Sequence, residues 1–288
     1  MIMKTFAILL LCLKVASAEP VVVNISIETD IYDYAQEILA GKSPIEITNF
    51  EAEHSQRDVV EFILVQKALA LGGANLTFSF ITGNYDSRNP KLLKNGLLLI
   101  NFDTMWLSHA QQFSEDVYIS DPIIHKGEYL AGVYTSLEHK NKLNIKNLSD
   151  FQNITAISNK NWPVDWQTLS QLNLYSLTHE EEWLSMAKLV TMGWVDIMLA
   201  PFTKSNDFSY QGDNYHIVAI EGIKIALNDS RHFIVSKKHP QGEETFNALQ
   251  KGLKILRKQG LIRKAYQQSG FFNEKTEDWL IINQSLLK

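Results

Sequence analysis

Side chains able to bind a small molecule follow the predicted strands of this chain. In open α/β sheets, ligands lie at the carboxyl ends of strands and at helix N-termini, where backbone N–H groups point outward. That rule assigns six residues to one wall of a cleft, namely Phe50, Glu51, His54, Asp103, Thr104 and Trp106. It assigns four residues to the opposite wall, namely Ser158, Asn159, Trp162 and Asp165. These groups offer hydrogen bonds, negative charge and aromatic surface, which suits a small polar solute.

Two kinds of side chain in this set have alternative interpretations. Trp162 could stack on a ligand or simply pack the start of a helix, and the same choice applies to Trp106. Arg231 is the one arginine beside a predicted strand close to the expected hinge between the two walls of the cleft. Its bidentate fork could clamp a carboxylate. The alternative is that Arg231 pairs with Asp229 or another surface carboxylate, which is the commoner arrangement.

Sequence motifs for catalysis and cofactors are missing from the chain. There is no Gly-x-Ser-x-Gly elbow, no His-Glu-x-x-His and no phosphate-binding glycine loop. The eight histidines are scattered, although His54, His109 and a carboxylate could assemble a zinc site across the cleft. We therefore expect a non-enzymatic protein without cofactor or metal, with a hydrolase or a metal-binding protein as alternatives.

The N-terminus has the pattern of a cleavable secretory signal. Lys4 precedes an apolar run at 6–13, and an Ala-x-Ala site ends at Ala18, so residues 1–18 are expected to be removed with Cys12, the only cysteine. Without Lys4 and Lys14, 25 basic residues face 32 acidic ones, a formal charge of −7. Such an acidic chain is a poor binder of nucleic acid or anionic membranes. We expect a periplasmic, monomeric protein that is not embedded in a membrane.

Strands and helices alternate along the rest of the chain in two sets. The first set comprises a strand at 45–50, a helix at 58–71, a strand at 75–80 and an apolar run at 97–100. The second set comprises extended segments at 128–135, 154–157, 174–177 and 196–200, with helices at 163–172 and 180–192 between them. Extended segments at 217–227 and 233–236 precede two helices at 243–259 and 261–269. This alternation predicts an α/β fold.

Several local segments resemble those of type 2 periplasmic solute-binding proteins, in the family that serves polar amino acid importers and periplasmic sensors. The matching segments, in the family's order, are 118–122 (Tyr-Ile-Ser-Asp-Pro), 148–151, 192–197 (Met-Gly-Trp-Val-Asp-Ile), 249–266 and Trp279. One feature departs from the family: amino acid binders usually place a carboxylate-clamping arginine where residues 103–120 of this chain hold neither Arg nor Lys. The resemblance therefore does not imply a standard amino acid ligand.

The resemblance implies two Rossmann-like α/β lobes joined by a two-strand hinge. The first lobe is expected to comprise residues 19–126 and 225–288, and the second, inserted lobe residues 127–224. It also implies that a small polar solute is captured by hinge closure and presented to a membrane permease or a membrane sensor. A protein-interaction module, with or without a ligand, is the alternative.

Overall fold

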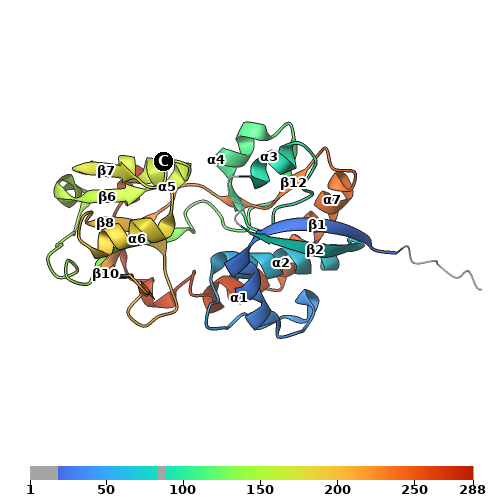
Figure 1. Cartoon of the computed structure of the whole chain (residues 1–288), viewed down its shortest axis with the longest axis horizontal. Coiled ribbons are helices and arrows are strands. Elements are labelled where there is room, and N and C mark those ends of the chain that lie inside the picture. The colour runs from blue at the N-terminus through green and yellow to red at the C-terminus, as the bar shows by residue number, and fades with distance from the viewer. Residues whose placement is uncertain (1–18, 84–87, 288) are drawn as a thin grey trace, which may run out of the picture.

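The computed structural model describes residues 19–83 and 88–287, so the predicted signal peptide lies outside the described residues. These residues form two lobes that lie side by side (Figure 1). Lobe 1 comprises residues 19–123 and 231–272, and lobe 2 comprises residues 130–226 and 273–287. Within the described ranges, no helix combines the length and the apolar character needed to cross a membrane.

Lobe 1 is built on two parallel strands, β1 (Val21–Glu28) and β2 (Leu76–Gly83). Alternate β1 side chains Val23, Ile25 and Ile27 are buried, as expected for β-branched residues on the inner face of a strand. Three short antiparallel contacts complete the lobe: β12 (Ile234–Ser236) with β4 (Val117–Ile119), β11 (Arg231–His232) with β3 (Met105–Trp106), and a bridge between Ile100 and Val235. The helices of this lobe are α1 (Thr29–Leu39), α2 (Arg57–Gly72), α3 (Asn89–Lys94), α4 (Leu107–Ala110), α7 (Gly242–Lys258) and α8 (Leu261–Gln268).

The first strand differs from the predicted one. Residues 45–50 are not a strand, because Pro44–Glu46 form a 3-10 turn that starts with a capping box between Ser43 and Glu46. The strand is instead β1, whose run of β-branched residues lies directly after the predicted signal peptide. Of the predicted strand at 97–100, only Ile100 makes a bridge.

Helices α2 and α7 pack with their backbones in near contact. A Cβ atom added to Gly252 would lie 1.8 Å from the carbonyl oxygen of Ala68, and one added to Gly72 would lie 1.8 Å from that of Ala248. Each glycine thus faces an alanine of the other helix. The two helices, which come from opposite ends of the chain, are therefore locked together in the core of lobe 1.

Lobe 2 contains a mixed sheet in the order β13-β10-β5-β8-β6-β7, with β9 added on β10. Its strands are β5 (Leu130–Ser136), β6 (Thr155–Ser158), β7 (Ser176–His179), β8 (Ile197–Pro201), β9 (Ser209–Gly212), β10 (Tyr215–Ala226) and β13 (Leu280–Ile281). Helices α5 (Pro163–Ser170) and α6 (Trp183–Thr191) connect the parallel strands β6, β7 and β8. The predicted helix at 180–192 begins later, since Glu182 is its N-cap.

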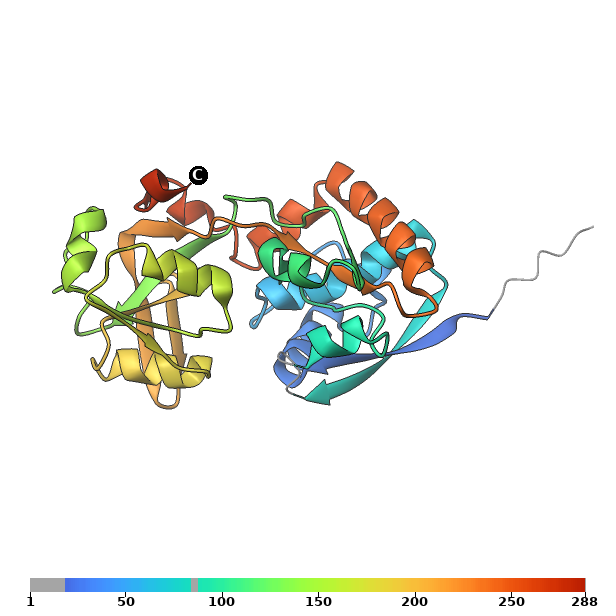
Figure 2. The ribbon, with the colours of Figure 1, turned by 90° about the horizontal axis from the view of Figure 1, so that it is seen from above.

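The chain crosses between the lobes three times, along residues 124–129, 227–230 and after Phe272 (Figure 2). The last crossing differs from the predicted division, which placed residues 225–288 in the first lobe. β13 pairs with β10 of lobe 2, and the Trp279 ring lies 5.4 Å from that of Phe202 and 5.1 Å from that of Phe208. Burial of this tryptophan against aromatic rings holds residues 273–287 on lobe 2.

Candidate ligand-binding site

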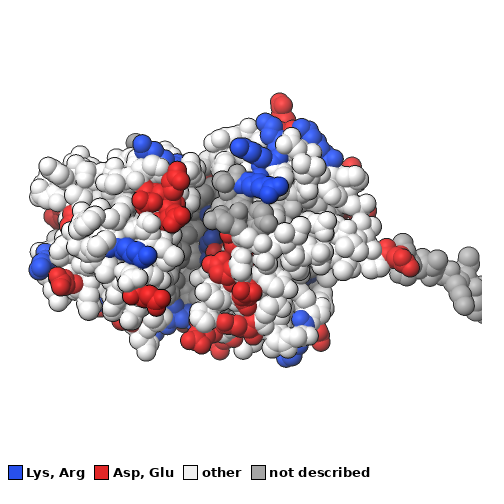
Figure 3. Space-filling view, viewed as in Figure 1, with Lys and Arg blue, Asp and Glu red and all other residues white. Residues whose placement is uncertain are grey.

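A groove separates the two lobes on the molecular surface, and acidic side chains gather along both of its edges (Figure 3). The carboxyl ends of β6, β7 and β8 and the N-termini of α2 and α5 supply the residues around this groove. Polar side chains at such positions are the usual ligand contacts of open α/β sheets.

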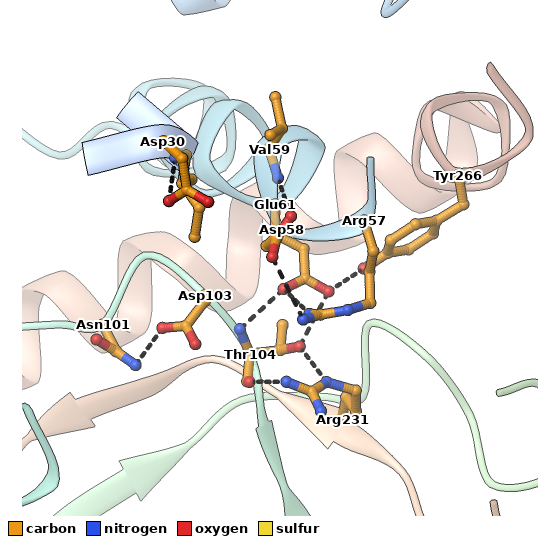
Figure 4. Close-up of polar contacts among 11 residues, drawn as sticks. Asp30, Arg57, Asp58, Val59, Glu61, Asn101, Asp103, Thr104, Arg231 and Tyr266 are labelled. Carbon is orange, nitrogen blue, oxygen red and sulfur yellow. Dashed lines mark hydrogen bonds and ion pairs between the residues drawn. The ribbon is translucent and has the colours of Figure 1, made fainter. Parts of the chain in front are cut away.

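Glu61 is the centre of a hydrogen-bond network on the lobe 1 side of the groove (Figure 4). Its fully buried carboxylate accepts hydrogen bonds from Arg57 Nη1 at 2.7 Å, Thr104 N at 2.9 Å, Thr104 Oγ1 at 3.0 Å and Tyr266 Oη at 2.9 Å. Burial alone would raise the pKa of Glu61, but Arg57, Arg231 and the hydrogen bonds outweigh it and lower the pKa. Glu61 is therefore ionised and fully paired inside the lobe.

Arg231 is fixed by Thr104 and by an aromatic ring. Its Nε donates to Thr104 Oγ1 at 2.7 Å, and its Nη2 donates to the Thr104 carbonyl oxygen. The guanidinium carbon lies 4.7 Å from the centre of the Trp106 ring and 6.0 Å from that of Tyr129, a cation–π arrangement. Strand β11 places Arg231 opposite Trp106 in the β11–β3 pair. Nη1 donates no hydrogen bond to any described residue, so this nitrogen is available to a ligand.

The predicted alternative partner of Arg231, Asp229, is engaged elsewhere. Its carboxylate accepts hydrogen bonds from the backbone N–H groups of Ser108 and Ser230, at 3.0 and 2.7 Å. Burial and the nearby Arg57 charge lower the pKa of Arg231, so both act against its positive charge. An anionic group of a ligand would compensate it.

Lobe 2 presents Asp165 to the groove from the first turn of α5. Burial raises the pKa of Asp165 to about 6, because the opposing effects of Arg231 and Arg57 across the groove are too weak to cancel it. In the described part of the chain, the only donor to this half-buried carboxylate is its own backbone N–H. Asp165 is thus an incompletely paired anion that faces two arginines.

The other predicted residues of lobe 2 support α5 and the loops beside it. Ser158 is buried, and its carbonyl oxygen accepts from Glu180 N at 3.1 Å. Asn159 donates to the carbonyl oxygen of Glu181 at 2.8 Å. Trp162 is the half-buried N-cap residue of α5 and packs against the lobe 2 core, in keeping with its alternative interpretation as packing at the start of a helix.

Three predicted residues of lobe 1 lie outside the network around Glu61. Phe50 is fully buried, and its backbone N–H donates to Gln268 Oε1 at 3.0 Å. Glu51 is exposed on the following loop. His54 stacks on Tyr34 with ring centres 4.5 Å apart and pairs with Glu37 at 2.7 Å. These three were placed by the strand predicted at 45–50, which the structure lacks.

The remaining predicted residues flank the network. Thr104 and Trp106 hold Arg231, while Asp103 accepts a hydrogen bond from Asn101 and its charge acts on Arg231. His109 packs edge-on against Phe113, with ring centres 5.7 Å apart. Within residues 19–83 and 88–287, no three His, Cys, Asp or Glu side chains converge as metal ligands.

Sequence reasoning missed Arg57 and Glu61. Helix α2 is buried almost continuously from Val59 to Leu69, and Glu61 and Lys67 are its only charged residues in that stretch. A charge in such an apolar stretch, with Arg57 four residues before it, was the available signal, because buried charges are retained only when they are paired. It also missed Tyr210 of β9, whose hydroxyl donates to the Pro201 carbonyl oxygen at 2.9 Å and lies within electrostatic range of Asp58 and Arg57.

Comparison with solved structures identifies the fold. The chain is similar to an ancestral arginine-binding protein bound to arginine, at 15% identity and a TM-score of 0.52, over 88% of this chain and 99% of that one. It is similar to ytmK of Bacillus subtilis, described as a probable amino-acid ABC transporter extracellular-binding protein, at 14% identity and a TM-score of 0.57, over 87% and 98%. It is also similar to the GluR0 ligand-binding core of Nostoc punctiforme in complex with L-glutamate, at 12% identity and a TM-score of 0.51, over 87% and 99%.

These similarities confirm the predicted fold, two α/β lobes of the type 2 periplasmic binding protein architecture. No protein-family model matches the chain, and no curated protein matches it. At 12–15% identity the likeness shows the fold, and the ligand must be argued from the site itself.

Proposed function

We propose that this protein captures a small polar solute with one carboxylate and one ammonium group in the groove between its lobes. The observation that carries the proposal is the pair formed by Arg231 and Asp165. Arg231 of lobe 1 has a free Nη1, and Asp165 of lobe 2 lacks a donor from any other described residue. A carboxylate on Arg231 and an ammonium on Asp165 would satisfy both groups at once.

Closure of the lobes follows from this division of contacts. A ligand shifts a two-state protein only if it binds one state better, so contacts from both lobes are needed to favour the closed form. Arg231 is already held rigidly by Thr104 and Trp106, so the solute docks first on lobe 1. Lobe 2 then brings Asp165 to the ammonium group. The closed form is presented outside the cytoplasm to a membrane permease or a membrane sensor.

The similar structures support a solute of this kind. They include an arginine-binding protein, a ligand-binding core in complex with L-glutamate and a probable amino-acid transporter binding protein. The ligands of such proteins carry a carboxylate beside an ammonium group. Residues 103–120 contain no Arg or Lys that could bind a ligand carboxylate. Arg231 of strand β11, close to the hinge, takes over this contact. This supports binding of a zwitterion without the family's usual arginine.

Thermal unfolding against a panel of solutes tests the proposal. The panel comprises amino acids, short peptides, organic acids, sugars, nucleosides and divalent metals. A ligand present at 100 times its Kd stabilises the folded protein by about 2.7 kcal/mol, which raises Tm by several degrees. We expect selective rises with zwitterions. A response to metals alone, or to nothing, would contradict solute binding and favour a metal-binding protein or a protein-interaction module.

The pH dependence of binding tests the role of Asp165. Because its pKa is raised to about 6 in the free protein, the carboxylate is protonated below that pH and cannot hold an ammonium group. We expect affinity for the zwitterion to fall by about tenfold per pH unit below 6 and to level off above 7. Isothermal titration between pH 4.5 and 8 measures this dependence.

Asp165→Asn provides the matched variant. It should bind weakly and without the dependence on pH between 5 and 7. A raised pKa in the folded state means that ionisation of Asp165 costs stability, a cost absent below about pH 4 and fully present above about pH 6. The variant should therefore be more stable than the native protein at pH 8 and equally stable at pH 4. Unchanged affinity in Asp165→Asn would remove this residue from the site.

A further inference from the structure

The lobe 1 side of the groove contains two arginines, Arg57 and Arg231, and both belong to the hydrogen-bond network of Glu61. Arg57 directs Nη1 at Glu61 and keeps Nη2 3.9 Å from Asp58, while its side chain is only 16% exposed. Arg231 donates hydrogen bonds from Nε and Nη2 to Thr104. The hydroxyl and backbone N–H of Thr104 in turn donate to Glu61. Glu61 therefore supplies, from within the protein, a carboxylate that pairs directly with Arg57 and connects to Arg231 through Thr104 (Figure 4).

From this arrangement we infer that Glu61 sets the charge of the solute, so that the site accepts one carboxylate and excludes dicarboxylates. The inference rests on the proposed function and specifies its ligand. Glu61 acts through Arg57 and Thr104 rather than by touching the solute, since it is fully buried and its two oxygens already accept four hydrogen bonds.

The charges around the groove favour this exclusion. Glu61 balances Arg57, and Asp103 and Asp165 both act on Arg231. Asp58 lies beside Arg57, so the group as a whole has more carboxylates than guanidiniums. A second ligand carboxylate would meet these anions in a partly desolvated groove, where like charges repel strongly.

Removal of the Glu61 charge alone is structurally feasible. In Glu61→Gln the amide has the same shape as the carboxylate, and its oxygen can still accept from Thr104 N and Arg57 Nη1. Its NH₂ group can donate to the hydroxyls of Thr104 and Tyr266, since a hydroxyl both donates and accepts. Arg57 then keeps this hydrogen bond but loses the negative charge of Glu61, so its positive charge attracts a ligand anion more strongly.

The experiment compares the native protein with Glu61→Gln by isothermal titration at pH 7.5. The probes are L-glutamine as the zwitterion with one carboxylate, and L-glutamate and succinate as solutes with two. The native protein should bind the dicarboxylates at least about tenfold more weakly than the zwitterion. Glu61→Gln should gain at least about tenfold in affinity for the dicarboxylates. A merely structural role of Glu61 would weaken all three probes together.

Two further variants isolate the effect of charge. Glu61→Asp keeps the carboxylate and should keep the exclusion. The double variant Arg57→Gln/Glu61→Gln removes one charge of each sign and should again exclude succinate. If Glu61→Gln does not fold, the double variant decides, because succinate binding by that protein would overturn the inference.

The outcomes separate the inference from the proposed function. A native protein that binds none of the zwitterions in the panel contradicts the proposed function. A native protein that binds a zwitterion, with a folded Glu61→Gln variant that still rejects succinate and L-glutamate, contradicts only the role of Glu61.

Discussion

Replacement of Arg231 by methionine is expected to weaken binding of the solute by at least about thirtyfold. Methionine matches the apolar stem of arginine, so contact with the Trp106 ring is partly kept while the guanidinium is lost. Truncation of one partner of a buried, hydrogen-bonded charge pair costs about 2–5 kcal/mol, and 1.4 kcal/mol is a factor of ten in affinity. Isothermal titration with the zwitterion that gives the largest Tm rise in the panel measures the loss.

Two other substitutions control for the loss of positive charge. Arg263 is exposed and stacks on Phe272 at 5.7 Å, outside the groove, so Arg263→Met should bind as the native protein does. Arg231→Lys keeps the charge but lacks the planar fork, and an intermediate affinity is expected. Binding by Arg231→Met within threefold of the native value would remove Arg231 from the site, whatever its effect on stability.

Substitution of Gly252 by alanine is expected to destabilise the protein by about 3 kcal/mol. The added methyl carbon would lie 1.8 Å from the carbonyl oxygen of Ala68, which belongs to the backbone of α2 and cannot rotate away. Helices α2 and α7 must then move apart, and overpacking of a close contact of this kind costs about 1–3 kcal/mol or more. Denaturant unfolding followed by circular dichroism gives the difference in free energy.

The neighbouring residue on α7 supplies the control for Gly252. Lys251 is exposed, and Lys251→Ala should change the free energy of unfolding by less than about 0.5 kcal/mol. For a chain of this size, 3 kcal/mol corresponds to a Tm lower by about 6–12 °C. An equal stability of Gly252→Ala and Lys251→Ala would mean that the two helices do not pack at this distance.

Local signals in the sequence located much of lobe 2. Pro163 marks the start of α5, Gly193 lies just past the end of α6, and the apolar segments at 154–157 and 196–200 become β6 and β8. Each of these signals acts within a few residues of the element that it defines. The prediction that Asp165 lines the groove rests on the same kind of signal, because its position follows from a strand that ends and a helix that begins beside it.

The strands at the start of lobe 1 could not be predicted from local signals of this kind. Ile45 and Ile47 alternate with polar residues as in a strand, yet Ile45 is 39% exposed and Pro44 begins a turn. A short alternating run cannot report whether a neighbouring strand exists to pair with it. The error moved the predicted wall of the cleft to Phe50 and Glu51 and left β1 without an assignment.

The centre of the site depends on contacts between distant residues. Glu61 bonds to Thr104 across 43 positions and to Tyr266 across 205 positions. No local pattern encodes such a pairing, since it follows from the packing of α2 on α8 and on the loop before β3. The sequence showed a charged pair on an apolar helix, but only the tertiary structure shows what that pair holds.

The packing of α2 on α7 also determines when lobe 1 can form as the chain is synthesised. Residues 73–241 lie between the two helices, and they include most of lobe 2. The side of α2 that packs on α7 therefore has no permanent partner until the chain has been made almost to its end. Contacts so distant in sequence form late, and exposed apolar surface aggregates in the meantime. An unfinished chain of this protein is thus a natural substrate for chaperones, because α2 cannot complete its packing before α7 has been synthesised.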